Sequence, residues 1–123
     1  MGVTNKNDFE LFQEFCTHWV EVLGLSEWEL KFKHEELGAP AWAGMRFHDL
    51  GQIATFLFNR DLDKGDVIED IEQIALHEVL ELLLHNLDRL AAQRKWSDEE
   101  YESERHKVIN RLTKVLLEGR STE

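Results

Sequence analysis

Apolar side chains recur along residues 68–92 at the spacing of a helix and leave a single narrow polar stripe. On an ideal helical wheel the apolar residues cover roughly two thirds of the circumference. The remaining sector holds two histidines and three carboxylates, with one isoleucine among them: His77, Glu78, Glu81, His85, Asp88 and Ile74. A helix this apolar is normally buried, so we expect it to form the centre of the fold.

Two other stretches have the pattern of amphipathic helices. Residues 9–23 place phenylalanines, Trp19 and Val20 at three-four spacing, and residues 98–118 carry one apolar stripe. Each stretch is bounded by residues that commonly begin or end helices. These are Asp8 and Gly24 for the first helix, and Ser97, Glu100 and Gly119 for the last.

Between the first helix and the central helix, apolar residues recur at every second position, as in β-strands. Residues 28–34 alternate apolar and charged side chains, and residues 42–47 and 52–59 also resemble strands. Asp66 can cap the central helix. The element order predicts one α+β domain over residues 1–123, in which a small, mainly antiparallel three-stranded sheet packs on the buried helix.

The size and charge of the chain narrow the function classes. The chain has 123 residues, which suits one domain, and a net charge of -11, which argues against direct nucleic-acid binding. The only cysteine, Cys16, lies among apolar residues and is expected to be a buried packing residue. A lone cysteine and the lack of a signal or spanning segment suit a cytoplasmic protein.

The polar stripe of the central helix contains a metal-binding pattern. His77 and Glu81 are four residues apart, so their side chains lie one turn apart and can converge on one ion. Glu78 follows His77 directly. In the zinc-protease signature H-E-x-x-H this glutamate is the general base. The sequence H-E-x-x-E keeps an acceptable second ligand, because zinc also binds carboxylates, and predicts a zinc site with Glu78 as the catalytic base.

A catalytic zinc usually has a third protein ligand. His85 lies eight residues after His77, about 12 Å along the helix, so both cannot reach one ion from an unbroken helix, although Glu81 and His85 could form a different pair. The last helix must fold back on the central one, and we favour its His106 as the third ligand. Glu102 and Glu104 are further candidates. His34, His48 and Arg46 are expected to be structural or solvated, although Arg46 could also stabilise an oxyanion.

Four segments together resemble the minimal zincin metallopeptidases, and more narrowly the small metallopeptidase-like proteins encoded by tailed bacteriophages. They are residues 28–34, 53–60, 75–84 and 104–112. The resemblance implies a zinc-dependent peptidase, in the host cytoplasm if the protein is phage-encoded. It implies that His77 is a ligand, that Glu78 is the base, and that residues 52–59 form the sheet edge to which an extended peptide adds. Glu81 departs from the family, which usually has histidine there, and His106 would then restore a set of two histidines and one carboxylate.

Three other functions are compatible with the sequence. The first is a catalytically inactive zincin-like protein that binds a host or phage protein. The second is a magnesium-dependent nucleotide pyrophosphatase with E-x-x-E pairs at Glu69/Glu72 and Glu78/Glu81, but the predicted strands argue against that all-helical class. The third is an acidic decoy of nucleic acid. If the protein is a zinc peptidase, we expect a peptide or protein substrate, and neither nucleic acid nor membrane as a partner.

Overall fold

The structure is a computed structural model that describes residues 4–38, 41–61, 71–93 and 97–121, with side chains described to residue 118 in the last helix. It confirms the α+β fold. The elements are α1 Lys6–Val22, β1 Glu29–Glu35, β2 Ala43–His48, β3 Ile53–Asn59, α3 Ile71–Gln93 and α4 Asp98–Ser121. The predicted cap Asp66 and the predicted beginning of the central helix at Ile68 lie outside the described residues.

The three strands form one mixed sheet in the order β1-β3-β2. β1 pairs with β3 in parallel and β2 pairs with β3 antiparallel, so the sheet is not mainly antiparallel as expected. The prediction that residues 52–59 form an open edge is wrong, because β3 is the central strand. Its composition explains the position: Phe56 and Phe58 are fully buried on one face, and Leu57 is also buried on the other. Among the described residues, β1 and β2 are the edge strands of the sheet.

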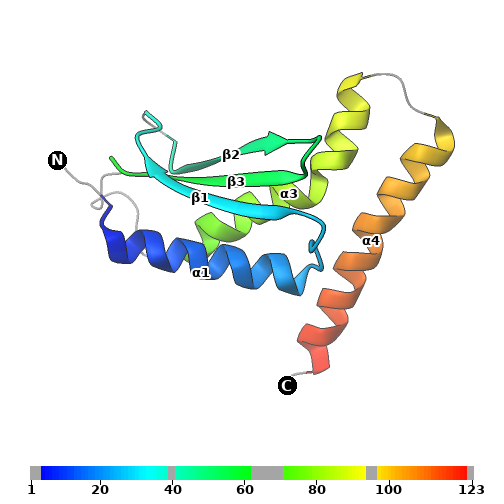
Figure 1. Ribbon diagram of the computed structural model, residues 1–123. Coiled ribbons are helices and arrows are strands. Elements are labelled where there is room, and N and C mark those ends of the chain that lie inside the picture. Colours follow the sequence, from blue (N-terminus) through cyan, green and yellow to red (C-terminus); the bar gives the residue numbers. More distant parts are fainter. Residues whose placement is uncertain (1–3, 39–40, 62–70, 94–96, 122–123) are drawn as a thin grey trace.

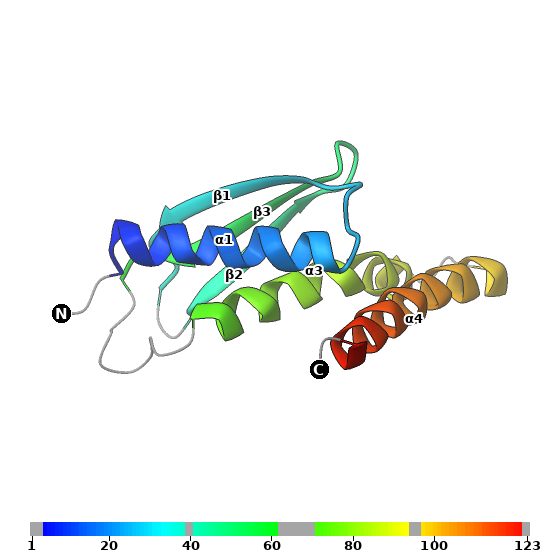
Figure 2. The same ribbon diagram turned by 90° about the horizontal axis from the view of Figure 1, so that it is seen from below.

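Helices α1 and α3 lie side by side against one face of the sheet, and α3 runs next to β2 (Figure 2). Their apolar faces meet the inward side chains of β3 in one core. Cys16 is fully buried in that core, as predicted. The Trp19 indole N–H also donates a hydrogen bond of 3.0 Å to the Glu72 carboxylate, which ties α1 to the first turn of α3. The central helix predicted from the sequence is therefore one of two helices that cover the sheet.

The helix ends agree only in part with the sequence-based expectations. The N-cap of α1 is Asn5, not Asp8; Asp8 is the third helical residue and completes a capping box with Asn5. Both residues carry side-chain oxygens that can cap a helix, and the reciprocal pair is formed when Asn5 takes the cap. Gly24 ends α1 with φ of +68°, as predicted. At the start of α4, Ser97 makes the predicted capping bonds, but the helix continues past Gly119 to Ser121.

Helix α4 follows α3 as a helical hairpin and then leads away toward the end of α1 (Figure 1). Val108 and Val115 pack against the core, and Arg111 forms an ion pair of 3.2 Å with Glu27 in the loop after α1. None of the described helices is both long and apolar enough to span a membrane.

Two buried polar residues fix the chain at the end of the sheet away from α4. The Thr4 hydroxyl donates to the Asn59 carbonyl, so the His34 ring, which also bonds this hydroxyl, must donate to it through Nε2. The Asn59 side chain accepts from the Leu37 amide at 3.2 Å and donates to the Ala41 carbonyl at 2.6 Å. His34 is thus structural, as expected, and Asn59 holds the loop that leads into β2.

Candidate metal centre

Three side chains of α3 converge at the surface of the helix next to β2. His77, Glu78 and Glu81 each offer a ligand atom, and these atoms all lie within 4.8 Å of one another. The His77 Nε2 and a Glu81 carboxylate oxygen are 4.0 Å apart. The helical repeat produces this arrangement, because residues four apart share a face. An imidazole and two carboxylates are ligands that divalent metals such as zinc accept, so this group could bind a metal ion.

The three side chains differ in their exposure. Glu78 is only 5% exposed, whereas the His77 and Glu81 side chains are 70% and 53% exposed. The pKa of Glu78 is raised to about 8, first by burial and then by a hydrogen bond and the negative charge of Glu81. In the metal-free protein at neutral pH, Glu78 is therefore mostly protonated. A cation at this position would offset the repulsion that the proton now relieves.

Two adjoining hollows lie between α3 and the edge strand β2, and Ala43, His77 and Glu78 line both of them. The larger, about 440 Å³, runs along the polar stripe of α3. The smaller, about 340 Å³, is closed by Trp42 and Ile74. All five polar residues of the stripe line the larger hollow: His77, Glu78, Glu81, His85 and Asp88. The polar stripe identified in the sequence therefore lines an open hollow beside β2, in which His77 and Glu81 remain largely exposed to solvent.

His85 is held rigidly at the far end of the larger hollow. Its Nε2 forms a contact of 2.6 Å with the Asp49 carboxylate, from the turn between β2 and β3. Its ring stacks on Phe47 with centroids 3.8 Å apart and meets the edge of Trp28 at 5.6 Å. The side chain is 16% exposed. The sequence placed His85 on the stripe, but the contact with Asp49 joins residues 36 positions apart and had no signal in the sequence.

His106 does not lie with this group, which corrects its prediction as the third ligand. Its side chain is 60% exposed and its Nε2 lies 3.3 Å from Glu102 one turn earlier on α4. Glu104 instead pairs with Lys107. His106 could reach His77 only if the central helix ended early, near residues 86–90, but α3 continues to Gln93. Within the described residues, the third member of the group is Glu78.

The remaining candidates from the sequence are scaffold or surface residues. Arg46 forms an ion pair of 2.9 Å with Glu35 and is 60% exposed. It pairs in register with Thr55, on the face of the sheet away from the helices, so it cannot reach the hollow beside α3. His48 is exposed at the end of β2.

Comparisons of the chain with known families, curated proteins and solved structures give no match.

Proposed function

We propose that this protein is a metal-dependent peptidase that uses a zinc ion held by His77 and Glu81. The observation that carries the proposal is the convergence of these two side chains with Glu78 in a hollow beside an open sheet edge. The donor set fits zinc, since one imidazole nitrogen and carboxylate oxygens are accepted ligands. No described cationic side chain lines either hollow to neutralise the two carboxylates instead.

In this proposal each side chain has a separate task. A zinc ion would act as a Lewis acid and would lower the pKa of a water molecule that it binds. His77 and Glu81 are exposed and one turn apart, so they can hold the ion while leaving positions open toward the hollow. Glu78 takes the proton of the attacking water and returns it to the leaving amine. Its buried position favours a pKa near neutrality, which a general base requires.

The edge strand β2 is the natural place for an extended substrate. It is an edge of the sheet, it lines both hollows with Ala43, and it lies directly beside α3. A peptide added to β2 would pass between the two hollows, in front of Glu78. The smaller hollow, bounded by Trp42 and Ile74, would take an apolar side chain of the substrate.

Metal content after reconstitution tests the binding part. The purified chain is stripped with EDTA, loaded with zinc, desalted and analysed by mass spectrometry for metals. We expect about one zinc per chain in the wild type, and near-complete loss in His77→Ala and in Glu81→Ala. His48→Ala is the matched control, because His48 is an exposed histidine away from the group. Wild-type protein that is folded and metal-free after loading would refute the proposal.

Hydrolysis of a mixed peptide library, read by mass spectrometry, tests the catalytic part. Glu78→Gln should retain zinc and lose at least roughly 100-fold in rate, as expected when a general base is removed. Because this variant is purified in the same way, it also controls for contaminating proteases. Equal cleavage by both proteins would show that Glu78 is not the base. Zinc binding without cleavage of any peptide would reject peptidase activity and leave only the metal site.

A further inference from the structure

Helix α4 packs against the core with one side and exposes a stripe of apolar side chains on the adjacent side. None of the described residues of α4 is buried, whereas α3 has eight buried residues. The side that faces the core uses Val108 and Val115. Neighbouring positions on the wheel expose four large apolar side chains: Tyr101 by 37%, Ile109 by 41%, Leu112 by 37% and Leu116 by 73%.

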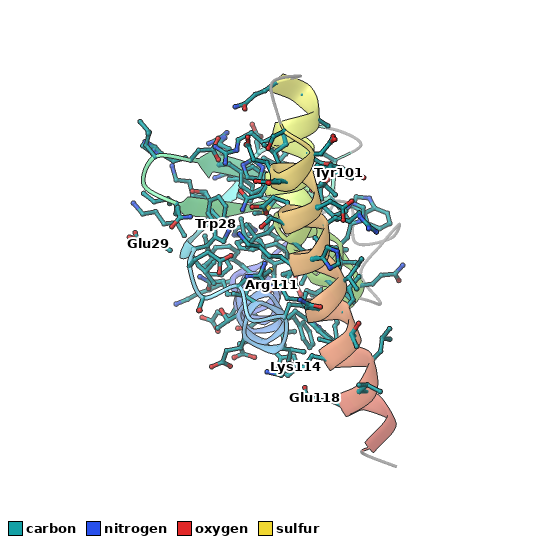
Figure 3. The ribbon with its side chains drawn as sticks, turned by 90° about the vertical axis from the view of Figure 1, so that its right-hand side faces the viewer. Trp28, Glu29, Tyr101, Arg111, Lys114 and Glu118 are labelled. Atoms are coloured by element: carbon teal, nitrogen blue, oxygen red, sulfur yellow. The ribbon has the colours of Figure 1, made fainter. Side chains whose placement is uncertain are left out.

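The two sides of α4 can be followed in Figure 3. Arg111 and Lys114 lie on the side near the end of α1, where they line a hollow with Leu23, and Tyr101 lies on the other side. The exposed apolar residues follow each other at three-four spacing from Tyr101 to Leu116, with Arg105 between them. Their combined exposed area is roughly 400 Å², a size at which apolar patches on a single chain are often binding surfaces.

We infer that this stripe is the interface of a homodimer in which α4 pairs antiparallel with α4 of a second copy. The stripe is nearly symmetric about Ile109. When the helix is reversed about this point, Tyr101 of one copy lies opposite Leu116 of the other and Ile109 lies near its own equivalent. The aliphatic stem of Arg105 covers Leu112 of the other copy, while its guanidinium stays in water. An isologous contact of this kind closes as a two-fold dimer.

Area and charge favour a second copy as the occupant. A standard interface buries about 800 Å² on each partner, of which about 56–65% is apolar, so the stripe supplies most of the apolar part. The chain has a net charge of -11, but α4 itself has six acidic and five basic residues. Nearly all of the negative charge therefore lies elsewhere. Two copies that meet through α4 bring together the surface on which like-charge repulsion is weakest.

Sedimentation velocity between 1 and 100 µM tests the dimer. The wild type should reach twice the mass of the 14.5 kDa chain. Leu112→Glu with Leu116→Glu should raise the dissociation constant at least about 100-fold, because two buried anchors become charged, while the circular dichroism spectrum stays unchanged. Leu50→Glu is the matched control: Leu50 is 99% exposed in the turn between β2 and β3, and its substitution should leave the dimer intact. A wild type that is monomeric at 100 µM would overturn the inference.

Single cysteines test the direction of the pairing. The native Cys16 is fully buried, so an introduced cysteine would be the one accessible thiol. Under mild oxidation Ile109→Cys should form a disulfide between copies, and Leu116→Cys should not, because antiparallel helices place the two copies of residue 116 about 22 Å apart. Efficient cross-linking at both positions would reject the antiparallel arrangement. Because α4 supplies no member of the metal group, these results are independent of the metal and of peptidase activity.

Discussion

The buried carboxyl group of Glu78 makes the stability of the metal-free protein depend on pH in an unusual direction. Its pKa rises from 4.5 in the unfolded chain to about 8 in the fold, with burial as the first cause. Between these values the folded state holds a proton that the unfolded state has lost. The contribution of Glu78 to stability is therefore most favourable below about pH 4.5, becomes less favourable as the pH rises toward 8, and is constant above that. Ordinary surface carboxylates that form ion pairs have the opposite effect.

The change in folding stability follows from the size of the pKa shift of Glu78. One unit of pKa corresponds to about 1.4 kcal/mol, so the full shift lowers stability by about 5 kcal/mol above pH 8, and roughly half of this loss occurs between pH 5 and pH 7. That is large beside the 5–15 kcal/mol of a typical domain. Glu78→Gln keeps the shape and polarity of the side chain but cannot ionise. The variant should therefore become more stable than the wild type as the pH rises.

Urea unfolding in EDTA, followed by tryptophan fluorescence at pH 5, 6, 7 and 8, measures the effect. The difference in unfolding free energy between Glu78→Gln and wild type should grow with pH by roughly 2–3 kcal/mol from pH 5 to pH 7. Glu81→Gln is the control that separates the effect of burial on the pKa of Glu78 from the effect of Glu81. It removes the neighbouring charge and hydrogen bond but leaves Glu78 buried, so most of the pH dependence should remain. A wild type and Glu78→Gln that differ by a constant amount at every pH would refute the reasoning.

Three other predictions concern the scaffold and the corrected ligand. The pKa of His34 is lowered, first by burial and then by the Arg60 charge, so its contribution should reduce the stability of the fold as the pH drops below about 6.5. His34→Gln should reduce this loss of stability, as measured by unfolding at pH 5.5 and 7.5. Asn59→Ala removes side-chain hydrogen bonds to the loop before β2 and should cost about 2–4 kcal/mol in urea unfolding. His106→Ala should bind zinc as tightly as the wild type in a competition titration with a chromophoric chelator; a tenfold weaker affinity would restore His106 as a ligand.

The spacing of apolar and polar residues along the chain was sufficient to predict the helices and strands of this fold. The strands and the last helix begin within one residue of their predicted positions, because alternation and three-four spacing are properties of neighbouring residues. The polar stripe of α3 was also predictable. Its five members are separated by one, three or four residues, so a regular helix must place them in one sector, and they line one hollow in the structure. Even Ile74, the apolar residue in that sector, lines the neighbouring hollow.

The order of the strands and the path of α4 depend on contacts between distant residues. The parallel pairing of β1 with β3 joins Glu29 to Ile53, and nothing in either segment specifies the partner. One signal was nevertheless present: β3 carries apolar residues on both faces, which is typical of a central strand. Arg111 and Glu27, which tie α4 to the loop after α1, are 84 residues apart. The error over His106 has another cause: α3 continues to Gln93, so the helical hairpin does not bring His106 back to His77.

The position of β2 decides whether the polar stripe of α3 can act on another molecule. Because β2 rather than β3 is the edge strand beside α3, an extended substrate would pair with β2 and not with β3. With β2 at the edge, α3 presents His77 and Glu81 toward solvent at the line where helix and sheet meet, while Glu78, about 100° further round the helix, turns toward the core. A shift of the motif by one residue toward the C-terminus of α3 would place its three side chains at positions 78, 79 and 82, all of which are buried. The chemistry thus depends on the register of one helix against one strand, and variants that change this contact, such as a bulky residue at Ala43, should abolish metal binding and stability together.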